Sequence, residues 1–199
     1  MSVKGFVAGI ILALLLVYVV DNYRHSRHLP GVLVSSEPYQ RLIPTGSPWK
    51  ENGVEFTPLA DFHLRGRILH TESYWFDRGS SISPLDLAVG WGPMSDQAVL
   101  DEIHLYQGQR WYTWQPVRQR LPLPNDEIVS HSANIHVIPG SPEIKKKLVS
   151  LRVGDVAELD GYLVEAQAKD GGRWTSSLSR TDVGSGACEL MWVRAVVVR

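Results

Sequence analysis

Two polar stretches in the second half of the chain hold most of the side chains that could carry out acid–base or nucleophilic chemistry. The first runs from His131 to His136 with the sequence HSANIH. Side chains alternate between the two faces of a strand, so Ser132, Asn134 and His136 would share one face. A row of hydroxyl, amide and imidazole groups can form a hydrogen-bonded network or a binding surface. A solvent-facing strand that serves no ligand is the alternative.

The two histidines of this stretch have a poor spacing for a shared metal ion. His131 and His136 would point to opposite faces of a strand, whereas paired metal ligands typically stand four residues apart on a helix. The chain contains a single cysteine, which excludes a site built from several cysteines. We therefore expect neither a metal ion nor a cofactor.

The second polar stretch, residues 176–189, is rich in serine and glycine and is predicted to be a loop at a sheet edge. Arg180 and Asp182 are placed to form a local ion pair, and backbone amides near Gly184 and Gly186 could cradle an anion. The stretch lacks the Gly-Lys-Ser/Thr of a phosphate-binding loop and the outer glycines of a hydrolase elbow. A plain hairpin loop explains the same composition.

An enzyme would need side chains from both stretches within about 3 Å of each other. The nucleophile would be Ser132, Ser177 or Cys188, and the base would be His131 or His136. Cys188 begins a very apolar segment, where a buried and inert thiol is the usual outcome. The candidate polar site consists of His131, Ser132, Asn134, His136, Ser177, Arg180, Asp182, Cys188 and Glu189.

An apolar segment at the N-terminus comes before these residues. Residues 5–20 (GFVAGIILALLLVYVV) carry no charge, and as a helix they would cover about 24 Å. A bilayer core is about 30 Å thick, and extending the helix from Val3 to Tyr23 fills it. No pair of small residues suitable for signal peptidase follows Val20. The segment therefore predicts an uncleaved transmembrane helix that contacts the lipid bilayer through residues 5–20.

The charges that flank this segment are nearly balanced, with Lys4 on one side and Arg24 and Arg27 on the other. The positive-inside rule therefore separates the two orientations poorly. A very short N-terminal tail favours a cytoplasmic N-terminus, which in a bacterial protein places the remaining chain on the periplasmic side. A cytoplasmic domain is the alternative.

Three regions are predicted along the chain. Residues 1–28 form the anchor and its juxtamembrane segment, and residues 29–60 form a linker or collar because five prolines interrupt them. Residues 61–199 form a soluble domain, in which apolar and polar residues alternate as they do in half-buried strands. Short helices are expected from Ser95 to about Ile103 and from Ser141 to about Leu151.

This pattern predicts an α+β fold that is mostly β, built on an antiparallel sheet or a small barrel. An OB-like barrel is one candidate for its C-terminal part. Trp91, Trp111 and Trp114 could line a recognition groove, although aromatic residues in strands more often belong to the core.

The net charge of −1 leaves no broad basic field that would hold a nucleic acid. With no catalytic motif in view, we expect a membrane-anchored accessory or interaction domain with a membrane or envelope protein as its partner. A membrane-anchored hydrolase is the alternative.

Overall fold

A computed structural model describes residues 3–77 and 79–199, and it describes side chains from residue 7 onward apart from residues 24 and 78. Within these residues the chain is a mixed α+β protein, with one large eight-stranded sheet, a separate two-stranded sheet and few helices. The prediction of an α+β fold that is mostly β is therefore confirmed.

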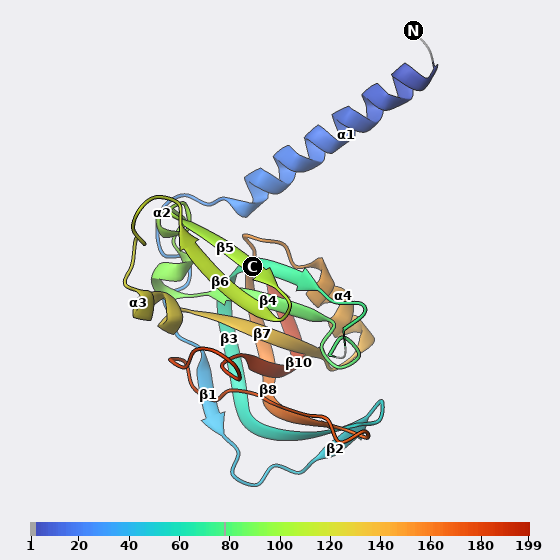
Figure 1. The fold of residues 1–199 in the computed structure, drawn as a ribbon, viewed down its shortest axis with the longest axis vertical. Helices are drawn as coiled ribbons and strands as arrows, with labels where there is room; N and C mark the ends of the chain where they lie inside the picture. Colours follow the sequence, from blue (N-terminus) through green and yellow to red (C-terminus); the bar gives the residue numbers. More distant parts are fainter. Residues whose placement is uncertain (1–2, 78) are drawn as a thin grey trace.

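Helix α1 (Val3–Ser26) projects away from the rest of the chain (Figure 1). Its apolar side chains are exposed along its length, with Leu12, Val17 and Tyr18 between 65% and 70% exposed. Within the part of the chain that the structure describes, no helix combines the length and the hydropathy that a membrane span requires. The predicted transmembrane span is therefore not confirmed, and the flanking charges at Lys4 and Arg24 lie outside the described side chains.

Polar contacts fix the C-terminal end of α1 to the sheet. The His25 ring lies 2.7 Å from the Asp155 carboxylate. The buried Arg67 guanidinium donates to the Ser26 carbonyl at 2.8 Å, and it also donates to the Ser95 carbonyl at 3.1 Å. The Gln97 side chain is a third partner of the same guanidinium. These contacts therefore fix the C-terminal end of α1 against the domain.

Five strands pair in a closed ring at the centre of the large sheet. In the order of pairing they are β3 (Val54–Ser73), β4 (Leu85–Gly90), β7 (Ser132–Pro139), β10 (Glu189–Val198) and β8 (Val156–Ala168). The N-terminal part of β3 pairs with β8 and its C-terminal part pairs with β4, which closes the ring. All these pairs are antiparallel except β7 with β10.

The core of the ring follows the alternation that the sequence predicts. On β3, the buried Phe62 and Leu64 alternate with the exposed His63 and Arg65. On β8, Leu159 is one of the residues that face the same core. Burying a side chain of this size stabilises the folded state by about 1.5–3 kcal/mol. The two predicted half-buried strands are confirmed.

The stretch predicted as a linker contributes to the same sheet. Strands β1 (Tyr39–Leu42) and β2 (Trp49–Glu51) both pair with β3, and Val34 is buried with its amide bonded to the Ser95 hydroxyl. The predicted boundary at residue 61 falls inside β3, so the chain shows no structural break there. Prolines are tolerated because they lie at edges or irregularities, as at the shift in the β3–β8 register after Pro58.

Helix α4 (Pro142–Ser150) is confirmed, with Ser141 as the predicted cap that accepts from the Ile144 amide at 3.2 Å. The other predicted helix is shorter than expected. It forms a 3₁₀ turn, η1 (Gly92–Ser95), followed by α2 (Gln97–Leu100). Asp96 caps α2 in place of the predicted Ser95, because its carboxylate accepts from the Ala98 amide.

The segment between β4 and β7 also holds a hairpin and a short helix. Among the described residues, strands β5 (Ile103–Gly108) and β6 (Trp111–Pro116) pair only with each other, and α3 (Asn125–Ser130) follows them. Figure 1 shows this hairpin lying across β4 and β7. Ile103 is buried and packs with Leu69 of β3, which fixes the hairpin on that face. The short strand β9 (Arg173–Thr175) pairs with β8.

Candidate functional site

The two polar stretches of the sequence meet because β7 pairs in parallel with β10. In this register Glu189 pairs with Ile135 and Leu190 pairs with His136. The structure therefore brings Asn134, His136, Cys188 and Glu189 to one region of the ring, although more than fifty residues separate the two stretches. The sequence contains no local signal for this pairing, since it depends on contacts between distant segments.

His131 lies apart from this region. It follows α3 directly, and its Nδ1 atom lies 2.9 Å from the Glu127 carbonyl, within its own helical turn. The two predicted histidines therefore do not share a site.

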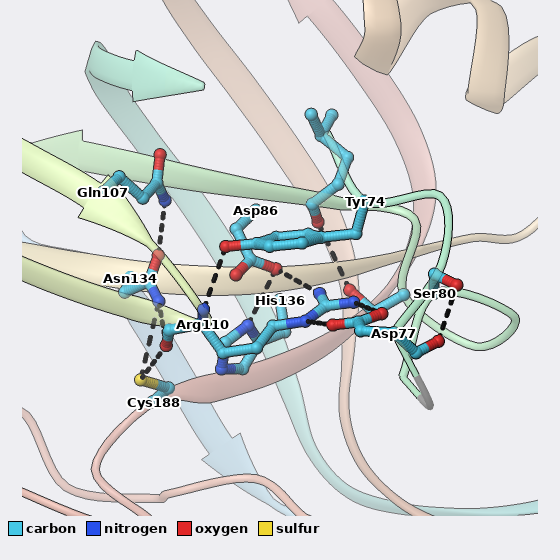
Figure 2. Close-up of polar contacts among 11 residues, drawn as sticks. Tyr74, Asp77, Ser80, Asp86, Gln107, Arg110, Asn134, His136 and Cys188 are labelled. Carbon is cyan, nitrogen blue, oxygen red and sulfur yellow. Dashed lines mark hydrogen bonds and ion pairs between the residues drawn. The ribbon is translucent and has the colours of Figure 1, made fainter. Parts of the chain in front are cut away.

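The tip of the β5–β6 hairpin is fastened to the ring by Arg110. Gln109 and Arg110 both have positive φ values of 51° and 70°. A two-residue hairpin turn of this kind normally uses glycine or asparagine, because other residues are strained there. The Arg110 guanidinium makes two contacts with Asp77, at 2.7 and 2.9 Å, and lies 3.7 Å from the centre of the Tyr74 ring (Figure 2).

The same guanidinium reaches the fully buried carboxylate of Asp86. The Nη1 atom of Arg110 lies 2.8 Å from Oδ1 of Asp86, and Nδ1 of His136 lies 2.8 Å from that same oxygen. The His136 contact is close but lacks the geometry of a hydrogen bond, and Oδ2 of Asp86 accepts no hydrogen bond from the described residues. The His136 ring also packs 4.8 Å from the Trp174 ring. Asp86 and Arg110 were not predicted as site residues.

An amide network holds the thiol of Cys188. The Nδ2 atom of Asn134 lies 3.6 Å from the Cys188 sulfur and donates to the Arg110 carbonyl at 3.1 Å. Gln107 donates to the other end of the Asn134 amide at 2.6 Å (Figure 2). Burial raises the pKa of Cys188 to about 11, so the thiol is protonated at neutral pH. Among the described contacts, none joins Cys188 to a histidine.

The two candidate serine nucleophiles donate to fixed acceptors. The Ser132 hydroxyl donates to the Ile128 carbonyl at 2.7 Å, which joins β7 to the helix before it. The Ser177 hydroxyl donates to the Asp182 carboxylate at 2.6 Å and so stabilises the loop around it. Neither hydroxyl has a histidine partner among the described contacts, so these serines have the environment of structural residues.

A buried ion pair joins the polar loop to the start of β10. The Nη1 atom of Arg180 lies 2.6 Å from Oε1 of Glu189, and the Glu189 side chain is only 4% exposed. Burial raises the pKa of Glu189 to about 7, even though Arg180 opposes this shift. The Arg180 guanidinium also lies 5.1 Å from the centre of the Phe62 ring and donates to Gln40 at 3.2 Å.

A cleft of about 250 Å³ opens beside this ion pair, between the hairpin, the start of β7 and the polar loop. Its walls are mainly apolar, with Trp111, Trp114, Val129, Ala133 and Val183 among them, and its polar groups include Asn134, Arg180, Asp182, Cys188 and Glu189. The suggestion that Trp111 and Trp114 line a groove matches this position. Trp91 is instead buried in the core.

A second cleft of about 390 Å³ lies on the other side of Cys188. Arg110, His136 and Trp174 line it together with the glycine-rich part of the loop. His136 and Cys188 of this cleft were predicted as site residues, whereas Arg110 and Trp174 were missed because they belong to no motif and their partners are distant in sequence. In the described part of the chain, no group of three or more histidine, cysteine or acidic side chains could hold a metal ion.

Comparisons with models of protein families, with curated proteins and with solved structures gave no match. A function for this chain therefore has to be argued from its own residues.

Proposed function

We propose that this protein is a membrane-tethered interaction domain, in which α1 contacts lipid and the cleft beside Arg180 and Glu189 binds a ligand. The proposed mode of attachment is a single-pass anchor through residues 5–20. Leucine, isoleucine and valine side chains are exposed along this helix, and each Å² of apolar surface removed from water gains about 25 cal/mol. The contacts of Arg67 and Asp155 with the end of α1 would hold the domain in one orientation at the membrane.

The observation that carries the binding proposal is the cleft itself. Apolar walls with a few converging polar groups are typical of ligand sites. A tether raises the local concentration of such a domain near a membrane or envelope partner, so modest affinity is sufficient. For a bacterial protein we place the domain on the extracytoplasmic side. The test is a reporter fused after Arg199 that works only in the cytoplasm. Activity of this reporter would contradict the extracytoplasmic placement.

The topology of the five-stranded ring supports a binding site in the same region. We infer that the ring is an OB-like barrel, since it has five strands, one parallel pair, and α4 between its third and fourth strands. In such barrels the second and third strands and the adjoining loops form the usual binding face. Here those strands are β4 and β7, and the cleft is lined by Ser132, Ala133 and Asn134 of β7. This is an analogy at the level of the fold and names no ligand.

The hydrolase alternative has one observation in its favour. Asp86 lies against His136, and both His136 and Cys188 line the second cleft. Against it, the thiol is held protonated by burial and Ser132 and Ser177 donate elsewhere. A nucleophile needs an adjacent base or a lowered pKa. Among the described contacts none pairs Ser132, Ser177 or Cys188 with a histidine, and the pKa of Cys188 is raised rather than lowered. Binding is therefore the better-supported function.

A photo-crosslinking experiment tests the binding proposal on the full chain in native membranes. We would replace Val183, which is 71% exposed and lines the cleft, by p-benzoylphenylalanine. The matched control carries the same group at Val149, which is 57% exposed on α4. Mass spectrometry should find a discrete adduct at position 183 and none at 149. Equal labelling at both positions, or none at 183, would reject the cleft as the binding site.

A further inference from the structure

The Arg180 guanidinium has unused hydrogen-bonding capacity although it is largely buried. It has five N–H donors in a planar fork that matches a carboxylate. The described contacts give one hydrogen bond, from Nη2 to Gln40, whereas Nε and Nη1 are buried without one. Nη1 lies 2.6 Å from Glu189, but the contact does not have hydrogen-bond geometry. Buried donors in this state favour an additional acceptor, and an anion is the strongest one.

The surroundings of this guanidinium limit what the acceptor can belong to. The cleft next to it is walled by Trp111, Trp114 and Val183, so the rest of the ligand must be apolar. A volume of about 250 Å³ lies just below the usual range of about 300–1,000 Å³ for drug-sized ligands. A short aliphatic chain or one apolar amino-acid side chain has the appropriate size.

Few charges act on Glu189, the partner of Arg180. Arg180 and Asp182, both in the polar loop, are the charged groups that influence its ionisation. The Asp182 carboxylate accepts a hydrogen bond from the Ser177 hydroxyl. On the neighbouring β7, the residue paired with Glu189 is the apolar Ile135. The cleft also contains the neutral Asn134 and Cys188, while Asp86 lies deeper and contacts Arg110 and His136.

We propose that the cleft binds an apolar ligand that ends in a carboxylate, with Arg180 as its counter-ion and Glu189 taking up a proton as the ligand binds. This inference rests on the proposed function, because it assumes that the cleft is the binding site. Two sources share this chemistry: a short fatty acid, and the C-terminal residue of a partner protein with an apolar side chain.

The proton is required because two carboxylates cannot both stay ionised beside one guanidinium in an apolar cleft. Glu189 already has a raised pKa of about 7, so it is the group that becomes neutral. The neutral carboxyl can then donate a hydrogen bond to the ligand carboxylate. By linkage, the ligand's affinity falls as the pH rises through 7, by up to tenfold for each pH unit above it.

The experiment titrates the full chain in phosphatidylcholine nanodiscs by calorimetry, with empty nanodiscs as the blank. Octanoate represents the fatty acid and N-acetyl-leucine represents the C-terminal residue. Octanol and N-acetyl-leucinamide are their uncharged controls. We expect one of the two carboxylates to bind about tenfold more tightly at pH 6 than at pH 8, and neither uncharged control to compete. Which carboxylate binds identifies the source.

Variants connect this pH dependence to the named residues. Arg180→Gln should weaken binding at least tenfold, and Arg180→Lys should restore part of it because it returns the charge. Glu189→Gln should bind at pH 8 about as tightly as the wild type does at pH 6. Arg194→Gln is the matched control, because Arg194 pairs with Asp160 at an exposed site on β10, and it should bind like the wild type.

Three results would overturn the inference. They are an absence of binding by both carboxylates at pH 6, equal binding of the uncharged controls, and an unchanged pH dependence in Glu189→Gln. Circular dichroism of each variant shows that the fold is intact. If position 183 still crosslinks while both carboxylates fail, the cleft binds a different ligand and the proposed function stands. If crosslinking also fails, the cleft is not a binding site.

Discussion

The Arg110 guanidinium lies 2.8 Å from the Asp86 carboxylate, which is fully buried on β4. Arg110 sits at the tip of a hairpin that pairs with no strand of the large sheet. Its side chain passes beside Tyr74 to reach Asp86 under the hairpin. The contact therefore fixes the hairpin over β4 and β7 and sets the position of one wall of the cleft.

Arg110→Ala should destabilise the protein by about 3–5 kcal/mol, because it leaves the Asp86 carboxylate buried without its counter-charge. Chemical denaturation followed by near-ultraviolet circular dichroism measures this loss. Arg118→Ala is the control, since the Arg118–Glu102 pair is exposed and should contribute less than about 1 kcal/mol. Equal effects of the two substitutions would show that the Arg110 contact does not hold the hairpin.

Arg67→Met should loosen the attachment of α1. The Ser26 and Ser95 carbonyls would lose the Arg67 donor, at a cost of about 1–3 kcal/mol for each buried group left unpaired, and the Gln97 oxygen would keep the His28 amide as its donor. Amide hydrogen exchange should become faster at His28, whose amide donates to Gln97. Arg27→Met, which removes an exposed pair with Asp101 and a contact with the Tyr23 ring, should leave that rate unchanged. Unchanged exchange at His28 in both variants would contradict this role of Arg67.

The free energy of unfolding should decrease as the pH rises, because of the buried carboxyl group of Glu189. The pKa of this group rises from an ordinary 4.5 to about 7 in the folded state, so its stabilising contribution is complete below pH 4.5. That contribution is lost as the pH rises through 7, and it is on the order of 3 kcal/mol in total. The free energy of unfolding of wild type minus that of Glu189→Gln should therefore fall between pH 5 and pH 8. A difference that stays constant over this interval would show that the group is not buried as described.

The thiol of Cys188 should react slowly with iodoacetamide at pH 7.5. With a pKa raised to about 11, its thiolate fraction is roughly 100-fold lower than that of an ordinary cysteine. The rate should increase about tenfold for each pH unit up to pH 10. Mass spectrometry of the intact chain measures it, with free cysteine as the reference. A rate at pH 7.5 equal to that of free cysteine would favour the hydrolase alternative.

The strands that alternate between core and solvent were predictable from the sequence. Phe62 and Leu64 on β3 alternate with exposed residues, Leu159 on β8 alternates with half-buried residues, and Ser141 with Pro142 marks the start of α4. These features depend on neighbours in the chain, which a sequence pattern records.

The hairpin and the edge strands were harder to predict. The turn at Gln109 and Arg110 contains neither glycine nor asparagine, so nothing local marks it. The prolines between residues 29 and 60 suggested a linker, whereas β1 and β2 fit between them as short edge strands. The cleft depends on the parallel pairing of β7 with β10, which is set by contacts between distant segments.

The tether is tested most directly by flotation of the full chain with phosphatidylcholine vesicles in a density gradient. The wild type should float with the vesicles. The double variant Leu12→Arg and Leu15→Arg, which places charges on two exposed positions of α1, should stay at the bottom with its circular dichroism spectrum unchanged. A wild-type chain that remains at the bottom, or a variant that floats equally well, would contradict the account.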